Sequence, residues 1–421
     1  MFKWFTELNK KEKRTFWACF SGWGLDAMDT QMYALTIPTL IALWHMSRGE
    51  AGLLGTAVLI MSALGGWIAG MLSDRFGRVR VLQLTIIWFA AFAFLSGFTN
   101  SFGELLLARS LQGLGFGGEW AVGSVLISET INARVRGRVV GAIQAGWACG
   151  YGIAVLLSTI IFSTLPQEYA WRVFFFCGLS PALLVLWIRR NIEEANVYVD
   201  AKKRTDESGS KGRTQLWDIF KPGYSWTTFR AVMLTTGIYG GNYVMITWLP
   251  AYLKMVLGLS IINVGAYLAV NIAGSFFGAF VNGFLADAIG RRKTFMLIAC
   301  MQATTVAVYT MAPINYTTIF CLGFVLGTLQ SGTAAGTGAF LAELFPTGIR
   351  GTAQGFCGNA GRAIGAIMPT MVGVLSAFLP LGISMGVCAC SAYVLVVIFA
   401  FLLPETRGRD LSSLKVQDSA G

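Results

Sequence analysis

The sequence GMLSDRFGRVR at residues 70–80 returns in altered form as GFLADAIGRRK at residues 283–293. The two copies share Gly, Leu, Asp, Gly and Arg at matching positions. A second related pair follows each copy at a similar distance: SETINARVRGRVVGAI at residues 128–143 and AELFPTGIRGTAQGFC at residues 342–357. Similarity on this scale predicts that the chain is built from two copies of one structural unit.

The composition is that of a membrane protein. Of the 421 residues, 55% are hydrophobic and only 13% are charged, which is too apolar for a soluble protein of this size. Several apolar segments are long enough to cross a hydrocarbon core about 30 Å thick. Because lipid offers the backbone no hydrogen-bond partners, each segment is expected to be a helix. These segments cover residues 15–43, 51–73, 81–98, 104–128, 138–163, 173–189, 229–254, 262–286, 294–311, 317–342, 352–377 and 383–403.

The predicted fold is an all-α integral membrane protein with twelve transmembrane helices in two six-helix bundles. Each half carries its repeated loops after its second and fourth spans, so the halves have the same orientation and form a parallel repeat. The predicted parts are an N-terminus (1–14), the N-terminal bundle (15–189), a linker (190–228), the C-terminal bundle (229–403) and a tail (404–421).

The distribution of basic residues predicts the orientation. Most of the 32 Lys and Arg residues fall in the termini and in the loops after even-numbered spans. Only Arg48, Arg172 and Lys254 lie in the opposite loops. The positive-inside rule therefore places both termini and the linker in the cytoplasm, and explains the net charge of +11 without a nucleic-acid partner.

The cysteines, the single histidine and the loop sequences indicate neither an enzyme nor a cofactor site. All eight Cys fall in apolar segments without C-x-x-C spacing, so we interpret them as packing residues. The single histidine, His45, cannot build a metal site or a Ser-His-acid triad, and no phosphate-binding loop is present. We expect no metal and no cofactor.

These motifs resemble the major facilitator superfamily over essentially the whole chain. The repeated G-x-L-[SA]-D-x-x-G-R-x-[RK] loop is the most specific of them, and RSLQGLGFGGEW (109–120) is similar to the family's fourth-helix motif. IRRNIEEANVY (188–198) resembles the metabolite:proton symporters, and the D-x-x-D of the first span resembles aromatic-acid and sialic-acid proton symporters. PETRGRDL (404–411) resembles the tail of sugar porters. The resemblance implies transport by alternating access.

The repeated loops carry matching glycines and charges. We expect the glycines to allow close helix approach and tight turns, and the charges to form a network that stabilises one conformation. The resemblance implies a cytoplasmic gate; plain positive-inside flanks are the alternative, but they do not explain the repeated Asp and Gly. The predicted gate residues are Gly70, Asp74, Gly77, Arg78, Glu129, Arg136, Gly283, Asp287, Gly290, Arg291, Glu343 and Arg350.

Five charged residues lie well inside the predicted spans: Asp26, Asp29, Arg109, Glu119 and Arg362. Each costs roughly 2.5 kcal/mol or more at the bilayer centre, so a functional role is the first hypothesis. The resemblance implies that Asp29 is the proton site and pairs with Arg109. Movement of the arginine would switch the carboxylate between charged and protonated states; a static pair joining two helices is the alternative.

The other two acids are open to two interpretations each. Asp26 is either a proton relay or a polar packing residue. Glu119 is either a second proton site or the partner of an arginine. We therefore group Asp26, Asp29, Arg109 and Glu119 as predicted proton-coupling residues.

Arg362 is the predicted clamp for an anionic substrate, because its planar guanidinium suits a carboxylate. A salt bridge to Glu119 or Asp26 is the alternative. Asn242 occupies the position of the second copy that corresponds to Asp29, which favours coupling on the first half and substrate contact on the second. The predicted substrate site also contains Tyr33, Trp120, Gln144, Tyr239, Asn242, Tyr243, Gln330 and Asn359.

The sequence thus predicts a monomeric secondary transporter in the inner membrane that takes up a small organic acid anion together with protons. Aromatic acids, muconate-like acids, sialic acid and hydroxy acids remain open as substrates. A proton-coupled sugar or polyol symporter and a transport-dead nutrient sensor are the alternatives. The expected partners are protons, the organic anion and the lipid bilayer.

Overall fold

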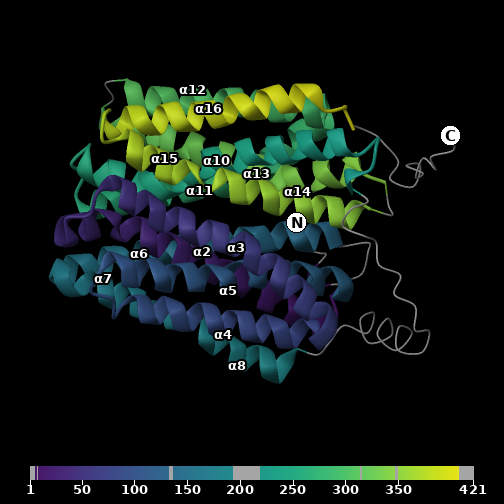
Figure 1. Ribbon diagram of the computed structural model, residues 1–421, viewed down its shortest axis with the longest axis horizontal. Helices are drawn as coiled ribbons and strands as arrows, with labels where there is room; N and C mark the ends of the chain where they lie inside the picture. The colour runs from purple at the N-terminus through teal and green to yellow at the C-terminus, as the bar shows by residue number, and fades with distance from the viewer. Residues whose placement is uncertain are drawn as a thin grey trace. The chain divides into compact units, whose positions relative to one another are not determined.

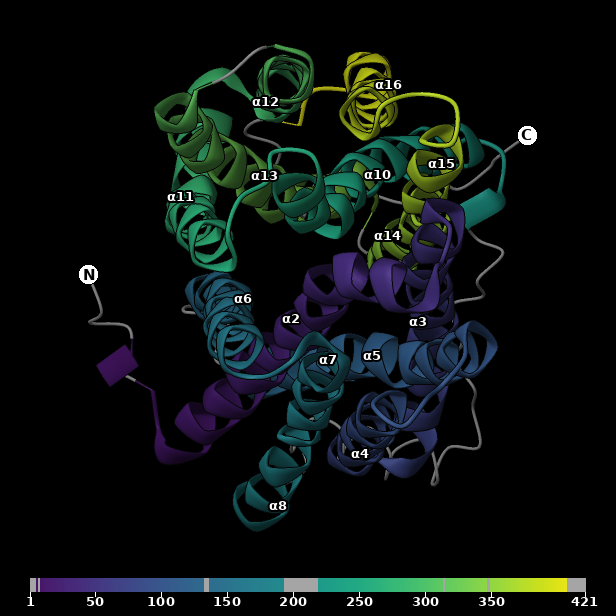
Figure 2. The same ribbon diagram turned by 90° about the vertical axis from the view of Figure 1, so that its left-hand side faces the viewer.

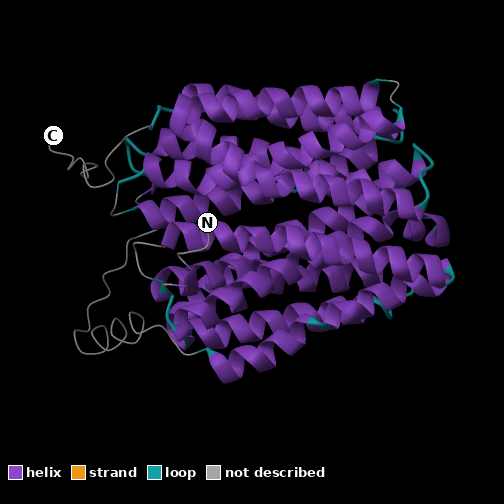
Figure 3. Ribbon diagram, turned by 180° about the vertical axis from the view of Figure 1, so that it is seen from behind, coloured by secondary structure: helices purple, strands orange, loops and turns teal. Residues whose placement is uncertain are grey.

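The computed structural model describes residues 5–6, 8–131, 136–192, 219–312, 315–346 and 349–406. Every regular element within these residues is a helix, which confirms the all-α fold class (Figure 3). The helices of the first half are α2 (Lys10–Trp44), α3 (Arg48–Phe76), α4 (Arg78–Ser96), α5 (Phe102–Thr130), α6 (Arg136–Thr164), α7 (Gln167–Phe176), the short 3₁₀ turn η1 (Cys177–Leu179) and α8 (Pro181–Asn191). Those of the second half are α10 (Ser225–Met255), α11 (Ile261–Ile289), α12 (Arg291–Met311), α13 (Tyr316–Leu344), α14 (Arg350–Gly365), α15 (Met368–Leu375) and α16 (Leu381–Leu402).

The first helix begins earlier than the hydropathy pattern predicts. Asn9 and Glu12 form a capping box, in which each side chain accepts a hydrogen bond from the backbone N–H of the other residue at 2.9 Å. This reciprocal cap satisfies two of the N–H groups that a helix start leaves without partners. The helix ends at the exposed His45, which adopts a left-handed conformation with φ 51°.

Two predicted spans are interrupted in the structure. The sixth span divides into α7, η1 and α8, and the eleventh divides into α14 and α15. Pro181 and Pro369 lie in the first turns of α8 and α15. A proline lacks the N–H needed to continue the preceding helix and its ring clashes with that turn, so each span breaks there.

The chain forms two compact units. The first comprises Met1–Lys211 with Thr247–Leu268, and the second comprises Gly212–Ile246 with Ala269–Gly421. Within each unit the long helices run side by side (Figure 1). The predicted linker lies mostly in residues 193–218, outside the described part, so the predicted domain boundaries stay predictions.

The internal repeat recurs in the packing of glycines. In the first unit, Gly113 of α5 lies so close to the carbonyl of Val58 on α3 that a Cβ would collide with it. In the second unit, Gly327 of α13 lies in the same way against the carbonyl of Asn271 on α11. Figure 2, which looks along the helices, shows α3 beside α5 and α11 beside α13. The two halves therefore repeat a backbone-to-backbone contact as well as a sequence motif.

Seven helices in the described part are long and apolar enough to cross a membrane: α3, α4, α6, α11, α12, α13 and α16. Helix α2, with 35 residues, is longer than any of these. It falls outside the set because polar side chains in its middle, among them Asp26 and Asp29, lower its mean hydropathy. Helix α2, which carries two buried acids, thus departs from the apolar pattern, and α5 and α10 also fall outside the set.

Candidate functional site

An ion pair joins α2 to α5 in the interior of the first unit. Arg109 Nη1 donates to both carboxylate oxygens of Asp29, at 3.1 Å to Oδ2 and 3.3 Å to Oδ1. Arg109 is 1% exposed and Asp29 is 3% exposed. Because each charge would be expensive to bury alone, the two side chains stabilise one another in this position.

Arg109 has a second oxygen partner that sequence reasoning missed. Its Nη1 also donates to Oε1 of Gln112 at 2.7 Å, and Gln112 is fully buried. Residues three apart share a helix face, so the R-x-x-Q spacing of the fourth-helix motif contained the signal. The arginine is therefore held by one charged and one neutral acceptor at the same time.

Aromatic rings enclose the same guanidinium. Its carbon lies 5.2 Å from the ring centre of Tyr33 and 5.6 Å from that of Phe175. Both distances allow a cation–π attraction that supports the charge in a dry site. The Tyr33 hydroxyl donates to the backbone carbonyl of Ala51 on α3. Tyr33, predicted to contact substrate, thus lies against Arg109 and uses its hydroxyl to fix its own position.

Two further acids lie along the same two helices. Asp26 is fully buried and Glu119 is 5% exposed. A Cβ on Gly22 of α2 would collide with Oε1 of Glu119 on α5. The absence of a side chain at Gly22 therefore creates the space that the Glu119 carboxyl fills.

Arg362 of the second unit lies among tyrosines of α10. Its Nε donates to the hydroxyl of Tyr243 at 3.3 Å, and its guanidinium carbon lies 6.0 Å from the ring centre of Tyr239. The two tyrosine rings stack with centres 5.8 Å apart. Arg362 is 8% exposed. The structure thus brings together three of the predicted substrate residues.

The predicted amide residues of the second unit differ in their hydrogen bonding. Asn242 is 7% exposed, and its Oδ1 has no hydrogen-bond partner among the described residues; the same holds for Nε2 of Gln330. Asn359 instead donates to the carbonyl of Gly355 in its own helix at 3.1 Å. Asn242 and Gln330 therefore keep polar atoms that a ligand could satisfy. The side chains of Trp120 and Gln144 lie outside the described part.

Some of the predicted gate residues contact one another or neighbouring residues. Arg291 Nη2 lies 3.5 Å from Oε1 of Glu343, and Thr406 Oγ1 donates to Oε2 of the same glutamate at 2.5 Å. Arg350 Nε donates to the carbonyl of Phe345 at 3.3 Å. Two of the predicted gate residues, Arg291 and Glu343, are therefore in contact, and Thr406 is an additional partner that the sequence did not reveal.

Glu405 is a second residue of this region that sequence reasoning missed. Its Oε1 accepts from the backbone N–H of Arg291 at 2.8 Å, and its Oε2 accepts from that of Arg292 at 3.2 Å. These N–H groups belong to the first turn of α12. The carboxylate therefore caps a helix start, where a negative charge is favourable.

The glycines of the repeated loops serve two different purposes. Gly77 and Gly290 adopt φ 104° and φ 98°, conformations that side chains disfavour, so they form the expected tight turns. A Cβ on Gly70 or Gly283 would meet no described atom within 4 Å. The close helix approach predicted for these two is thus absent from the described part of the chain.

The remaining charged residues of the predicted gate are described only in part. Arg78 donates to Oγ of Ser73 at 3.0 Å. The side chains of Asp74, Glu129, Arg136 and Asp287 lie outside the described residues.

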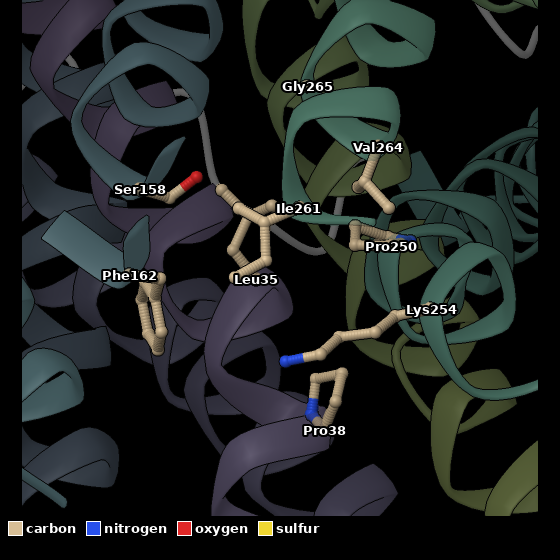
Figure 4. A pocket seen from close by; sticks show the side chains of 9 residues that line it. All are labelled: Leu35, Pro38, Ser158, Phe162, Pro250, Lys254, Ile261, Val264 and Gly265. Carbon is tan, nitrogen blue, oxygen red and sulfur yellow. The ribbon is translucent and has the colours of Figure 1, made fainter. Parts of the chain in front are cut away.

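A small cavity of about 30 Å³ lies elsewhere in the first unit (Figure 4). Its walls are mainly apolar, and the Lys254 side chain extends across it toward Pro38. Pro38 follows Asp29 by nine residues on α2, which is about 14 Å along a helix. The cavity is therefore separate from the buried ion pair. Its lining is Leu35, Pro38, Ser158, Phe162, Pro250, Lys254, Ile261, Val264 and Gly265.

Comparison with known proteins yields one family and several close relatives. The family model described as Major Facilitator Superfamily matches residues 19–287 and 263–418. A probable 4-methylmuconolactone transporter of Cupriavidus pinatubonensis is 42% identical over 100% of this chain and 96% of its own. The cis,cis-muconate transport protein of Acinetobacter baylyi is 29% identical over 90% of this chain and 92% of its own.

The fold also matches solved structures. The xylose transporter XylE from E. coli, in a partially occluded inward open conformation, superimposes with a TM-score of 0.76. The match covers 96% of this chain and 100% of the other at 18% identity. At that identity the similarity establishes a common fold.

Proposed function

The chain belongs to the major facilitator superfamily and is a multi-pass membrane transporter rather than an enzyme, and we propose that it takes up a small organic acid anion together with protons. The observation that carries this proposal is the buried pair of Asp29 and Arg109. A carboxylate that can change its protonation inside a membrane, beside a cation with an alternative partner, has the properties of a proton carrier.

The surroundings of Arg109 suit such a change. When Asp29 takes up a proton, its charge disappears and the ion pair weakens. Arg109 then keeps the amide oxygen of Gln112 and the faces of two aromatic rings. The buried cation thus retains partners in both protonation states, which lowers the free-energy difference between them.

The substrate side of the proposal rests on Arg362. The hydrogen bond from Nε to Tyr243 orients the guanidinium plane. A planar, oriented guanidinium binds a carboxylate through two parallel hydrogen bonds. The relatives named for 4-methylmuconolactone and for cis,cis-muconate support an unsaturated carboxylate of this type. We therefore propose a muconolactone- or muconate-like acid as the substrate class.

The proposed location is the inner membrane, with both termini in the cytoplasm, because the basic residues cluster in the loops on that side. One proton entering with a monovalent anion is electroneutral and draws on the pH gradient alone, whereas any additional proton also draws on the membrane potential. Carriers of this fold hold their substrate near the midplane and expose it to each side in turn. We propose that a single chain performs this cycle.

Uptake into proteoliposomes tests the proposal. The purified protein is reconstituted, a pH gradient that is acid outside is imposed, and uptake of labelled 4-methylmuconolactone, cis,cis-muconate, benzoate and xylose is compared. We expect accumulation of at least one carboxylate, and its loss when a protonophore collapses the gradient. Gradient-driven uptake of xylose without uptake of any carboxylate would show that the substrate class is wrong.

A further inference from the structure

Among the described residues that line the small cavity of the first unit, Lys254 alone carries a charge. It lies in the last turn of α10, and its side chain extends across the cavity toward Pro38 of α2 (Figure 4). The proposed orientation puts this end of α10 on the outer side of the membrane, where the basic residues are Arg48, Arg172 and Lys254. The chain thus directs a positive charge into a mainly apolar space on its outer side.

The end of α10 does not need this lysine as a cap. The carbonyl of Tyr252 accepts from the backbone N–H of Val256 at 3.0 Å. The carbonyl of Leu253 accepts from the backbone N–H of Leu259 at 3.1 Å. A lysine in the last turn of a helix often binds carbonyls of this kind, but here the following residues of the chain already satisfy them. The ammonium of Lys254 is therefore left for another partner.

Lys254 makes no ion pair and no hydrogen bond with any described residue. The acids expected on the same side of the membrane are Glu50, Glu104 and Glu168. Glu50 and Glu104 each accept a backbone N–H at 2.8 Å at the starts of their own helices, α3 and α5, and Glu168 lies in the first turn of α7. Because a partly buried ammonium without an anion is unfavourable, an anion from solution would stabilise it.

Arg172, another basic residue of this side, is engaged by the protein itself. Its Nη1 donates to the carbonyls of Gly97 and Thr99, and its Nη2 donates to Oδ1 of Asn100, each at 2.9 Å. These contacts occupy the guanidinium and join two loops of the first unit. Lys254 differs from Arg172 because its charge has no such partner and is directed into a space.

We propose that Lys254 is an outer capture residue: when the cavity opens to the outside, its ammonium attracts the substrate carboxylate before the substrate binds at Arg362. The inference rests on the proposed function, since it describes how that carrier collects its anion. In the present conformation the cavity has room for only one or two water molecules, so the substrate contacts Lys254 once the space widens. Lysine is a flexible, strongly hydrated point charge, which attracts an anion without holding it through two fixed donors.

Uptake kinetics in intact cells that produce the protein test the capture residue, with external 4-methylmuconolactone as the probe. For Lys254→Gln we expect the KM to rise roughly fivefold, the factor that one opposite charge contributes in water, and the maximal rate to stay unchanged. Lys254→Arg keeps the charge and is the matched control, so its KM should stay near that of the wild type. Because salt screens exposed charges, the wild-type KM should rise with ionic strength and that of Lys254→Gln should not. A wild-type KM in Lys254→Gln would overturn the proposal.

Chemical labelling tests the same contact without any transport. Every other lysine of the chain lies in a part predicted to be cytoplasmic, so a membrane-impermeant amine reagent added to intact cells should label Lys254, as read by mass spectrometry. We expect 4-methylmuconolactone and benzoate to slow this labelling and xylose to leave it unchanged. The protection should persist in Arg362→Lys, because contact with Lys254 does not require the clamp.

The outcomes of the labelling separate this inference from the proposed function. A Lys254 that is not labelled, labelling that no carboxylate slows, or protection that disappears in Arg362→Lys would each overturn the capture residue. Protection by carboxylates without proton-driven uptake would overturn only the proposed function.

Discussion

The amide oxygen of Gln112 lies 2.7 Å from Nη1 of Arg109, closer than either carboxylate oxygen of Asp29 at 3.1 and 3.3 Å. Nη1 of Arg109 thus donates both to Asp29, which loses its charge when it is protonated, and to Gln112, which is neutral at all times. The amide anchors the arginine whatever the protonation of Asp29. In the proposed coupling, Gln112 therefore holds Arg109 in place while Asp29 changes its protonation.

Replacing Asp29 with Asn should uncouple transport. The amide is close in size to the carboxylate but cannot bind and release a proton, so a proton gradient can no longer drive net uptake. We expect gradient-driven accumulation to disappear while exchange of external for internal substrate continues. Both are measured in the same proteoliposomes. Accumulation equal to that of the wild type would remove Asp29 from the coupling role.

Replacing Gln112 with Leu should slow proton-driven uptake more than exchange. The substitution leaves Arg109 without its neutral acceptor whenever Asp29 is protonated, at a free-energy cost of about 1–3 kcal/mol. We expect an approximately tenfold or greater loss of the initial rate under a pH gradient. Gln112→Glu is the matched control, because it keeps an oxygen acceptor at the same place and should retain more activity. Equal rates for wild type and Leu variant would contradict this role.

The architecture was largely predictable, because hydropathy and the internal repeat locate helices directly. The interruptions of the sixth and eleventh spans were not predicted, since a hydropathy pattern does not register the lost N–H of Pro181 or Pro369. The contact between Asp29 and Arg109 followed from the cost of isolated charges in lipid and from the family resemblance. Prediction from the sequence was therefore most accurate where a single physical constraint determines the structure.

The remaining contacts depend on tertiary structure. Glu405 caps a helix that begins more than a hundred residues earlier in the chain, and no local pattern links the two positions. Tyr33 could be identified as a polar aromatic of the interior. Its orientation toward Arg109 depends on the Ala51 carbonyl, which belongs to another helix. The spacing of residues along the sequence does not predict contacts of this kind, which join different helices.

Replacing Arg362 with Lys should weaken binding of carboxylates. Lysine keeps the charge but loses the planar pair of donors, and hydrogen bonds to charged groups are worth about 1.5–3 kcal/mol. We expect at least an approximately tenfold rise in the dissociation constant, measured by calorimetry in detergent. Tyr243→Phe removes only the hydroxyl that orients Nε, and should cost about twofold to tenfold. Unchanged carboxylate affinity in the Lys variant would contradict the clamp.

Replacing Glu405 with Ala should lower the thermal stability of the protein. The carboxylate accepts from the backbone N–H groups of Arg291 and Arg292, and the preceding residue, Gly290, has no side chain to cap the helix. Loss of a helix cap costs typically about 1 kcal/mol. For 150–250 residues each kcal/mol lowers the melting temperature by about 2–4 °C, and a drop of that size should appear in detergent.

The variant Thr406→Val provides the matched control for this cap. Valine is close in shape to threonine but lacks the hydroxyl that donates to Glu343, while the carboxylate of Glu405 stays in place. Because hydrogen exchange of the first turn of α12 reports the cap directly, its amides should exchange faster in Glu405→Ala and at the wild-type rate in Thr406→Val. Equal exchange in the two variants would show that the fall in melting temperature arises elsewhere in the tail.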